Sequence, residues 1–248
     1  MTDTQVLLCD DAVAVAETAA EMFIEHLVKV LEQKSEAHVV LTGGTVGIKT
    51  LAAIAEHESV GEVDFRRVHF WWGDERFVAA NSAERNELQA REVLLSKIVL
   101  DEAKVHAFPA SDDGFNLDEA AASFADQVAE LAAVDEIVPE FDVVFLGIGP
   151  DGHVASLFPG KAEPASGVAI IAEPDSPKPP AQRLSFSYEA LGSSHQVWFV
   201  VAGADKADAV AVAFGESPES LPVGRVEGRD ATLWFIDESA GAAVFETE

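Results

Sequence analysis

The sequence predicts an α/β fold, namely a Rossmann-like, mainly parallel sheet flanked by helices on both faces. Short segments rich in β-branched and aromatic residues alternate with longer segments whose apolar residues recur every three or four positions. Several of the short segments are apolar at nearly every position, as strands covered on both faces are. Strands that alternate with helices imply right-handed crossovers, and these produce a parallel sheet.

The first half of the chain indicates two helix–strand pairs and then a third helix. Residues 12–31 carry an apolar stripe at helical spacing, and residues 37–41 (AHVVL) indicate a strand. Residues 45–57 again have helical spacing, and residues 68–72 (VHFWW) follow as a strand. Asn81 with Glu84 three positions later is typical of a capping box, so we expect a helix from there to about residue 96.

The second half continues this alternation. Asn116 and Glu119 repeat the capping pattern ahead of an apolar stripe that reaches residue 132. Residues 141–146 (FDVVFL) and 196–202 (QVWFVVA) indicate buried strands, residues 205–214 a helix and residues 231–236 a last strand. Prolines interrupt residues 159–180, where we expect a long functional loop rather than a linker. The expectation is therefore a single domain over residues 1–248.

The composition limits the classes of function. The formal charge is −28 with only 16 Lys and Arg residues, which argues against nucleic acid and anionic membranes as partners, because both need basic patches. The single cysteine can form no internal disulfide, and residues 1–15 lack the pattern of a secretory signal. No apolar run approaches the roughly 20 residues of a membrane span. We expect a cytoplasmic protein, a monomer or small homo-oligomer, in which an anionic substrate would need a local positive charge.

Ligands of open parallel sheets bind beyond the carboxyl ends of the strands, so the loops there are candidate sites. The predicted strand at 37–41 is followed by TGGTVG and then by a helix. Gly43 and Gly44 let an anion approach the backbone, and Thr45 adds a hydroxyl at a helix N-terminus that favours negative charge. This loop is a candidate phosphate site. An ordinary tight turn explains TGGT equally well, and no G-K-[ST] follows that would make a Walker loop.

The predicted strand at 68–72 runs into GDER, which places three charges at the end of a strand. Arg76 can offer two parallel donors to phosphate or carboxylate oxygens, while Asp74 or Glu75 could hold it in place. The alternative is a solvated turn with a local ion pair.

Residues 147–153 (GIGPDGH) match G-x-G-x-x-G, the fingerprint of dinucleotide-binding loops. Such a loop opens a helix of about three turns, whereas Pro159 leaves room for only about two, and Pro150 removes a backbone N–H that a phosphate would need. The loop instead presents Asp151 and His153 beyond a buried strand. A histidine can accept a proton from water near neutral pH, and a nearby carboxylate can orient it. A histidine bonded to the backbone of a turn is the simpler alternative.

A metal site and a serine nucleophile have less support in the sequence. The other six histidines form no H-x-x-x-H pattern and no cluster of ligands, so we expect no metal. Ser156 lacks a G-x-S-x-G context, so a serine nucleophile is a minor option.

Taken together, TGGT, GDER and GIGPDGHVASLFPG resemble the 6-phosphogluconolactonase family, the lactone hydrolases of the oxidative pentose phosphate pathway. The same resemblance extends to SPKPPAQR with the following LSF at residues 176–186, and to GADK at residues 203–206. It covers roughly residues 39–214. The related glucosamine-6-phosphate deaminases look like DGHIAFNEP and DEY at these points, so SLF at residues 156–158 and Arg76 favour the lactonases. Val46 and Gly47 replace the Ser/Thr-Pro of many relatives, which leaves the phosphate geometry open.

The resemblance implies a sheet similar to that of the deaminase and ribose-5-phosphate isomerase group, and a phosphorylated sugar lactone, 6-phospho-D-glucono-1,5-lactone, that is hydrolysed without a cofactor. His153 would be the general base that deprotonates water, Asp151 would set its orientation and pKa, and Arg76 would stabilise the oxyanion or steer the substrate. The residues implied to hold the phosphate are Gly43, Gly44, Thr45, Arg183, Lys178 and Lys206.

Two alternative functions stay open at this point. One is a sugar-phosphate deaminase or isomerase of the same fold, in which a carboxylate removes a proton from carbon. The other is a non-catalytic sugar-phosphate sensor, which would normally need an added interaction module. The presence of both Asp151 and His153 favours chemistry over sensing.

Overall fold

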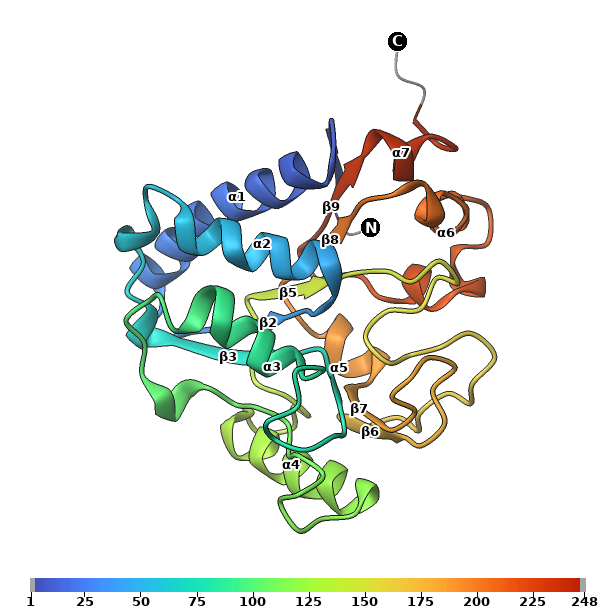
Figure 1. Ribbon diagram of the computed structural model, residues 1–248. Helices are drawn as coiled ribbons and strands as arrows, with labels where there is room; N and C mark the ends of the chain where they lie inside the picture. The colour runs from blue at the N-terminus through green and yellow to red at the C-terminus, as the bar shows by residue number, and fades with distance from the viewer. Residues whose placement is uncertain (1–2, 246–248) are drawn as a thin grey trace.

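Six parallel strands form the central sheet of the computed structural model, which describes residues 3–245 (Figure 1). Their order across the sheet is β1-β9-β8-β5-β2-β3, and every neighbouring pair is parallel. The strands are β1 (Asp3–Cys9), β2 (Ala37–Leu41), β3 (Val68–Trp72), β5 (Val143–Leu146), β8 (Gln196–Val201) and β9 (Ala231–Asp237). The mainly parallel α/β sheet predicted from the sequence is confirmed.

The connections between the strands are mostly helical. The helices are α1 (Ala12–Gln33), α2 (Gly44–Glu56), α3 (Asn86–Ala90) with a π-helical turn at Arg91–Leu95, α4 (Leu117–Leu131), α5 (Tyr188–Gly192), α6 (Ala207–Ala213) and α7 (Glu238–Gly241). Short 3₁₀ turns lie at Val60–Glu62, Phe65–Arg67, Glu102–Lys104, Ala204–Lys206, Pro218–Ser220 and Pro222–Arg225. The predicted helix at 205–214 is thus a 3₁₀ turn followed by α6. Within residues 3–245 we find no helix with the length and hydropathy needed to cross a membrane.

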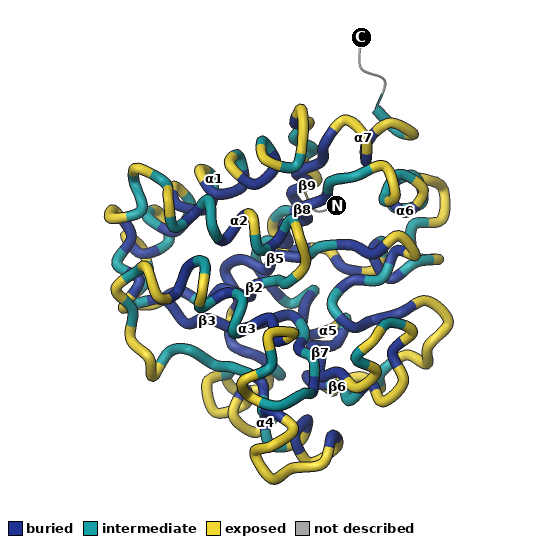
Figure 2. The backbone as a smooth tube through the Cα atoms, viewed as in Figure 1, coloured by how far each residue is buried: buried dark blue, intermediate teal, exposed yellow. Residues whose placement is uncertain are grey.

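Helices and a small sheet cover the two faces of the central sheet. Phe23 of α1 packs against Phe145 of β5, with ring centroids 5.2 Å apart, and α2 lies beside α1 on the same face (Figure 1). On the opposite face Trp71 of β3 contacts Phe124 of α4 at 6.2 Å, and Phe124 contacts Phe186 at 6.3 Å. Figure 2 shows β2, β3, β5, β8 and β9 as largely buried, whereas the edge strand β1 is mostly exposed or half-buried. The near-continuous apolar sequences of the strands follow from this double coverage.

A second, antiparallel sheet in the order β4-β7-β6 was not anticipated. It consists of β4 (Asp74–Arg76), β6 (Ile170–Glu173) and β7 (Arg183–Phe186). The expectation of one long loop over residues 159–180 is therefore wrong for residues 170–173, because the prolines flank this strand rather than interrupt it. The register of β4 and β7 sets Arg76 opposite Arg183 and so brings two basic residues, far apart in sequence, to one place.

Helix α3 begins at Asn86, five residues after the predicted start at Asn81. The local capping box does not form. Instead, the buried carboxylate of Glu75 accepts the N–H groups of Asn86 and Glu87 at 2.8 and 2.9 Å, which satisfies the free donors at the helix start. Burial raises the pKa of the Glu75 carboxyl, and Arg85 at 3.9 Å together with the N–H donors opposes that rise.

The capping box predicted for the next helix is confirmed. Asn116 accepts from the N–H of Glu119 at 3.0 Å, and Glu119 accepts from the N–H of Asn116 at 2.9 Å. These reciprocal bonds satisfy two backbone donors and set the start of α4.

Candidate active site

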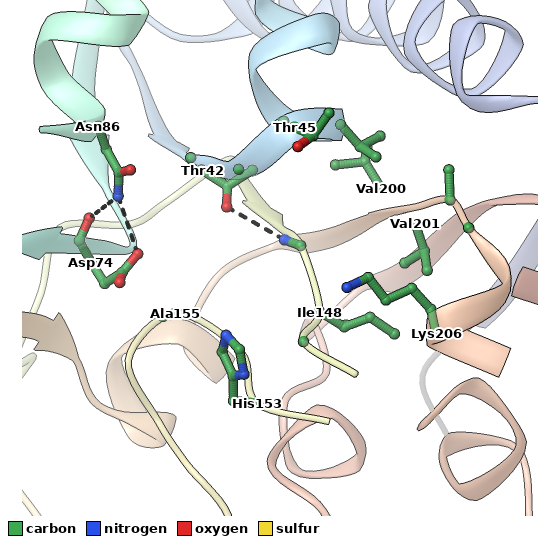
Figure 3. A pocket seen from close by; sticks show the side chains of 18 of the residues that line it. Thr42, Thr45, Asp74, Asn86, Ile148, His153, Ala155, Val200, Val201 and Lys206 are labelled. Atoms are coloured by element: carbon green, nitrogen blue, oxygen red, sulfur yellow. Dashed lines mark hydrogen bonds between the residues drawn. The ribbon is translucent and has the colours of Figure 1, made fainter. Parts of the chain in front are cut away.

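A cavity of about 580 Å³ opens at the carboxyl edge of the central sheet, beside the start of α2 (Figure 3). Loops from both sheets meet there. Eight of the nine site residues predicted from the sequence line it: Gly43, Gly44, Thr45, Arg76, His153, Lys178, Arg183 and Lys206. The ninth, Asp151, contacts two of these eight, His153 and Lys178. The structure therefore brings the three loops, widely separated in sequence, into a single site.

The start of α2 forms one wall of the cavity. Gly44 has φ +79°, a left-handed conformation that glycine adopts without the steric cost of a side chain. Among residues 3–245 no side chain caps this helix, so its first N–H groups can bind an anion. Thr42 accepts a hydrogen bond from the N–H of Gly147 at 3.4 Å, which ties this loop to the end of β5 (Figure 3).

The GIGPDGH loop folds back on itself instead of opening a helix. The N–H of Gly149 donates to the carbonyl of His153, and the N–H of Gly152 donates to the carbonyl of Gly149, both at 2.9 Å. Turns and an isolated bridge between Val154 and Leu157 follow, so even the two helical turns allowed by the sequence do not form. The loop therefore lacks the helix N-terminus on which a dinucleotide pyrophosphate sits.

A glycine at position 149 is required by the side chains of the loop. A Cβ there would lie 2.0 Å from Nδ1 of His153 and 2.4 Å from Oδ1 of Asp151. Such distances are far inside van der Waals contact, so any larger residue at position 149 would displace both side chains.

His153 and Asp151 form a hydrogen-bonded pair, with 2.6 Å between Nδ1 and Oδ1. An ionised carboxylate can only accept, so Nδ1 carries the proton and Nε2 of the neutral ring keeps its lone pair. The His153 side chain is 18% exposed, and the ring lies 4.8 Å from that of Phe158. Lys178 lies beside the pair, with its Nζ 3.5 Å from Nδ1 of His153 and 3.7 Å from Oδ1 of Asp151.

The electrostatics favour a neutral imidazole beside an ionised carboxylate. Burial lowers the pKa of His153, Asp151 raises it in part, and Lys178 lowers it further, with a net shift below the usual value. Burial would raise the pKa of Asp151, but the hydrogen bond from His153 and the charge of Lys178 outweigh it, and the net pKa is lowered. At neutral pH this pair is in the protonation state that a general base requires.

Arg76 reaches the cavity from β4. Its Nη1 donates to the carbonyl of Glu84 at 2.6 Å and to Oδ1 of Asn86 at 2.7 Å. Its Nε is buried and has no hydrogen-bond partner within residues 3–245, so the protein does not use all of its donors. The expectation that Asp74 or Glu75 holds this side chain is wrong. Glu75 accepts the backbone N–H of Arg76 instead. The Asp74 carboxylate accepts from Ser156 and Asn86.

Arg183 lines the cavity but uses most of its donors within the protein. Its Nε donates to the carbonyl of Pro180 at 2.7 Å, and its Nη2 donates to the carbonyls of Lys178 and Pro179 at 3.3 and 3.2 Å. Nη1 lies 3.9 Å from Oδ2 of Asp74. Arg183 therefore orders the loop that carries Lys178, and its predicted contact with a phosphate stays a prediction.

Lys206 enters the cavity from the 3₁₀ turn after β8. Its Nζ lies 2.9 Å from the carboxylate of Asp205. Figure 3 shows its amino group directed into the space between Thr45 and His153. Lys206 is thus placed to add positive charge between the glycine loop and the histidine.

The serine option finds no support in the geometry. Ser156 is 1% exposed, and its hydroxyl donates to Oδ2 of Asp74 at 2.6 Å rather than to a histidine. A nucleophilic serine needs a base that can remove its proton. Residues 3–245 also hold no cluster of three or more side chains that could bind a metal ion.

Sequence reasoning did not single out Asn86 or Thr42, although both line the cavity. Asn86 belongs to no motif that we recognised, whereas Thr42 is the first residue of the TGGT loop but was given no role of its own. Each acts through a contact with a segment that is distant in sequence.

Comparison with known proteins places the fold and its loops in context. A family model described as glucosamine-6-phosphate isomerases/6-phosphogluconolactonase matches residues 10–234. A protein of Streptomyces coelicolor named 6-phosphogluconolactonase is 40% identical, with 98% of this chain and 95% of that protein covered. One of the same name from Mycobacterium tuberculosis is 41% identical, with 84% and 85% covered. The crystal structure of 6-phosphogluconolactonase from Thermotoga maritima superposes with a TM-score of 0.80 at 27% identity, with 95% of this chain and 100% of that chain covered.

Proposed function

Because the chain belongs to the glucosamine-6-phosphate isomerase/6-phosphogluconolactonase family, we propose that it is a lactone hydrolase that converts 6-phospho-D-glucono-1,5-lactone to 6-phosphogluconate. The observation that carries this proposal is the pair formed by Asp151 and His153 in a cavity that also holds four basic side chains. A neutral imidazole can activate water, and the cations suit an anionic substrate.

The reaction follows from these groups. Nε2 of His153 takes a proton from a water molecule, whose oxygen attacks the lactone carbonyl carbon to form a tetrahedral oxyanion. The Asp151 carboxylate stabilises the imidazolium that results. Arg76, which lines the cavity, stabilises the oxyanion through its positive charge. The carbonyl then re-forms, the bond to the ring oxygen breaks, and the imidazolium returns its proton to that oxygen.

The phosphate lies at the start of α2 in this proposal. The N–H groups after Gly43 and Gly44 and the hydroxyl of Thr45 provide donors, and the helix dipole favours the negative charge. Lys206 supplies an amino group directed into the space beside Thr45, and Lys178 and Arg183, which also line the cavity, add positive potential.

The test of the reaction is the rate of acid release from fresh 6-phosphogluconolactone, corrected for spontaneous hydrolysis. His153→Ala should lower kcat by at least about 10²-fold and leave the folded state intact, because it removes the general base. Activity within a few-fold of the parent would rule out this role. A deaminase would instead release ammonia from glucosamine-6-phosphate, which the same preparation can be assayed for.

The phosphate site has its own test. Thr45→Ala or Lys206→Ala should raise KM for the phosphorylated lactone and have little effect on unphosphorylated gluconolactone, because the lost contact is far from the reacting carbon. An equal loss on both substrates would contradict the assignment.

A further inference from the structure

Asn86 is a buried polar residue, 2% exposed, whose side chain reaches the cavity wall. Its Oδ1 accepts a hydrogen bond from Nη1 of Arg76 at 2.7 Å. Its Nδ2 donates to the carbonyl of Asp74 at 2.9 Å and lies 3.4 Å from Oδ1 of the same residue (Figure 3). One end of the amide thus holds the guanidinium, and the other end holds the strand from which that guanidinium projects.

The same amide packs against Gly43. The backbone of Gly43 has φ −86°, which any residue can adopt, so conformation does not explain a glycine there. A Cβ at this position would lie 2.0 Å from Oδ1, 2.5 Å from Cγ and 3.0 Å from Nδ2 of Asn86, and these are its three nearest atoms. The space that a side chain at position 43 would need is therefore filled by the amide of Asn86.

The backbone of Asn86 is fixed from the side away from the cavity. Glu75, 1% exposed, accepts the N–H groups of Arg76 and Asn86 with one oxygen, both at 2.8 Å, and that of Glu87 with the other. The carboxylate joins the backbone of β4 to the start of α3. The amide of Asn86 consequently projects from an anchored position.

We propose that Asn86 is a positioning residue, which joins the glycine loop at the start of α2 to Arg76 and holds the Arg76 guanidinium in the cavity. The inference rests on the proposed function, in which Arg76 acts on the substrate. A neutral amide suits this task, because it accepts a hydrogen bond without neutralising the positive charge that the anionic substrate and the oxyanion need. A carboxylate at position 86 would compete with the substrate for that charge.

The first experiment is a double-mutant cycle with Arg76. Asn86→Ala should lower kcat/KM by about 10- to 100-fold, because a displacement of about 1 Å can cost as much. The loss should divide between kcat and KM as it does in Arg76→Ala, and the double variant should be no less active than Arg76→Ala. Gln89→Ala is the matched control, since this side chain of α3 donates to the carbonyl of Ala83 outside the cavity, and it should leave activity unchanged.

Either of two results would overturn the inference: activity of Asn86→Ala within about threefold of the parent, or full additivity of the two losses in the double variant. Gly43→Ala keeps both Asn86 and Arg76 in the chain and so provides a test even where Asn86→Ala fails to fold. Its added methyl group should displace the amide and lower kcat/KM about as much as Asn86→Ala does.

The second cycle combines Gly43→Ala with Asn86→Ala. The methyl group then meets no amide, so the double variant should be no less active and no less thermally stable than Asn86→Ala alone. An equal cost of Gly43→Ala in both backgrounds would contradict the inference. Melting temperatures report this coupling without any assay of activity. Inactivity of the parent protein toward the lactone would refute the proposed function, whereas loss of the coupling would refute the role of Asn86.

Discussion

Replacing Asp151 by Asn tests the general-base assignment most directly. The substitution removes the carboxylate whose Oδ1 lies 2.6 Å from Nδ1 of His153. An amide of the same shape can turn either its oxygen or its NH₂ group toward the ring, and the NH₂ group would favour the tautomer with the proton on Nε2. That tautomer cannot accept a proton from water. We therefore expect kcat to fall by about 10²- to 10⁴-fold.

The same substitution should move the acid limb of the pH profile, and the sign follows from the structure. Burial holds the pKa of His153 below its usual value, while Asp151 raises it in part. A hydrogen bond to a charged group contributes about 1.5 to 3 kcal/mol, which we reduce to about 1 kcal/mol because the Asp151 side chain is 39% exposed. The pKa of the base should thus fall further in Asp151→Asn, because the raising contribution of the carboxylate is lost.

The measurement is kcat/KM between pH 5 and 7.5 for the parent and Asp151→Asn, with spontaneous lactone hydrolysis subtracted at each pH. In the parent, the acid limb should lie below pH 6.5, because the pKa of the His153 imidazole is lowered from its usual value. In the variant, the residual activity should persist to still lower pH. An acid limb that moves to higher pH, or a kcat within about threefold of the parent, would refute the pairing of Asp151 with the base.

Three further substitutions test other parts of the structure. Ser156→Ala should lower kcat less than about tenfold, because its hydroxyl donates to Asp74; a loss of about 10³-fold in a steady-state assay would instead favour a serine nucleophile. Glu75→Gln should lower the free energy of unfolding by about 3 kcal/mol, measured in urea, because it leaves the buried Arg85 without its carboxylate; a change under about 1 kcal/mol would count against this. Burial lowers the pKa of His38 to about 3, so the unfolded chain binds a proton that the folded chain does not, and stability is lost as pH falls below about 6.5. His38→Asn should reduce that slope by about 1 kcal/mol per pH unit on average between pH 6.5 and 5, and equal slopes in both proteins would contradict it.

The central sheet could be predicted because its strands are buried on both faces. Residues 37–41 and 68–72 form strands with the predicted bounds. Their short, mostly apolar sequences are typical of strands that are covered on both faces. Strand β1, at the edge of the sheet and largely exposed at its start, gave no such pattern. Strands β6 and β7 are four residues long; Pro174 follows β6 directly and Pro180 lies three residues before β7, so local signals of irregular structure prevailed over them.

The start of α3 shows why boundaries set by tertiary contacts could not be predicted. Asn81 and Glu84 match the sequence pattern of a capping box. The free N–H groups at the observed start of α3, however, donate to Glu75 of strand β4. Sequence patterns record local capping alone. The same distinction applies to the candidate site. Residues of sequence motifs in the loops after strands could be predicted, whereas Asn86 could not, because it acts through contacts with Gly43 and Arg76.

The way the cavity's arginines are held explains how a protein with 44 acidic residues keeps a positive site for an anion. Four of its 16 basic residues line the cavity. Arg76 is oriented by a carbonyl and an amide, and the short hydrogen bonds of Arg183 go to carbonyls, with the carboxylate of Asp74 no nearer than 3.9 Å. Neutral acceptors fix the geometry of a guanidinium without pairing its charge. The charge is therefore left for the substrate, and this is the physical reason for an asparagine, and not an acidic residue, at position 86.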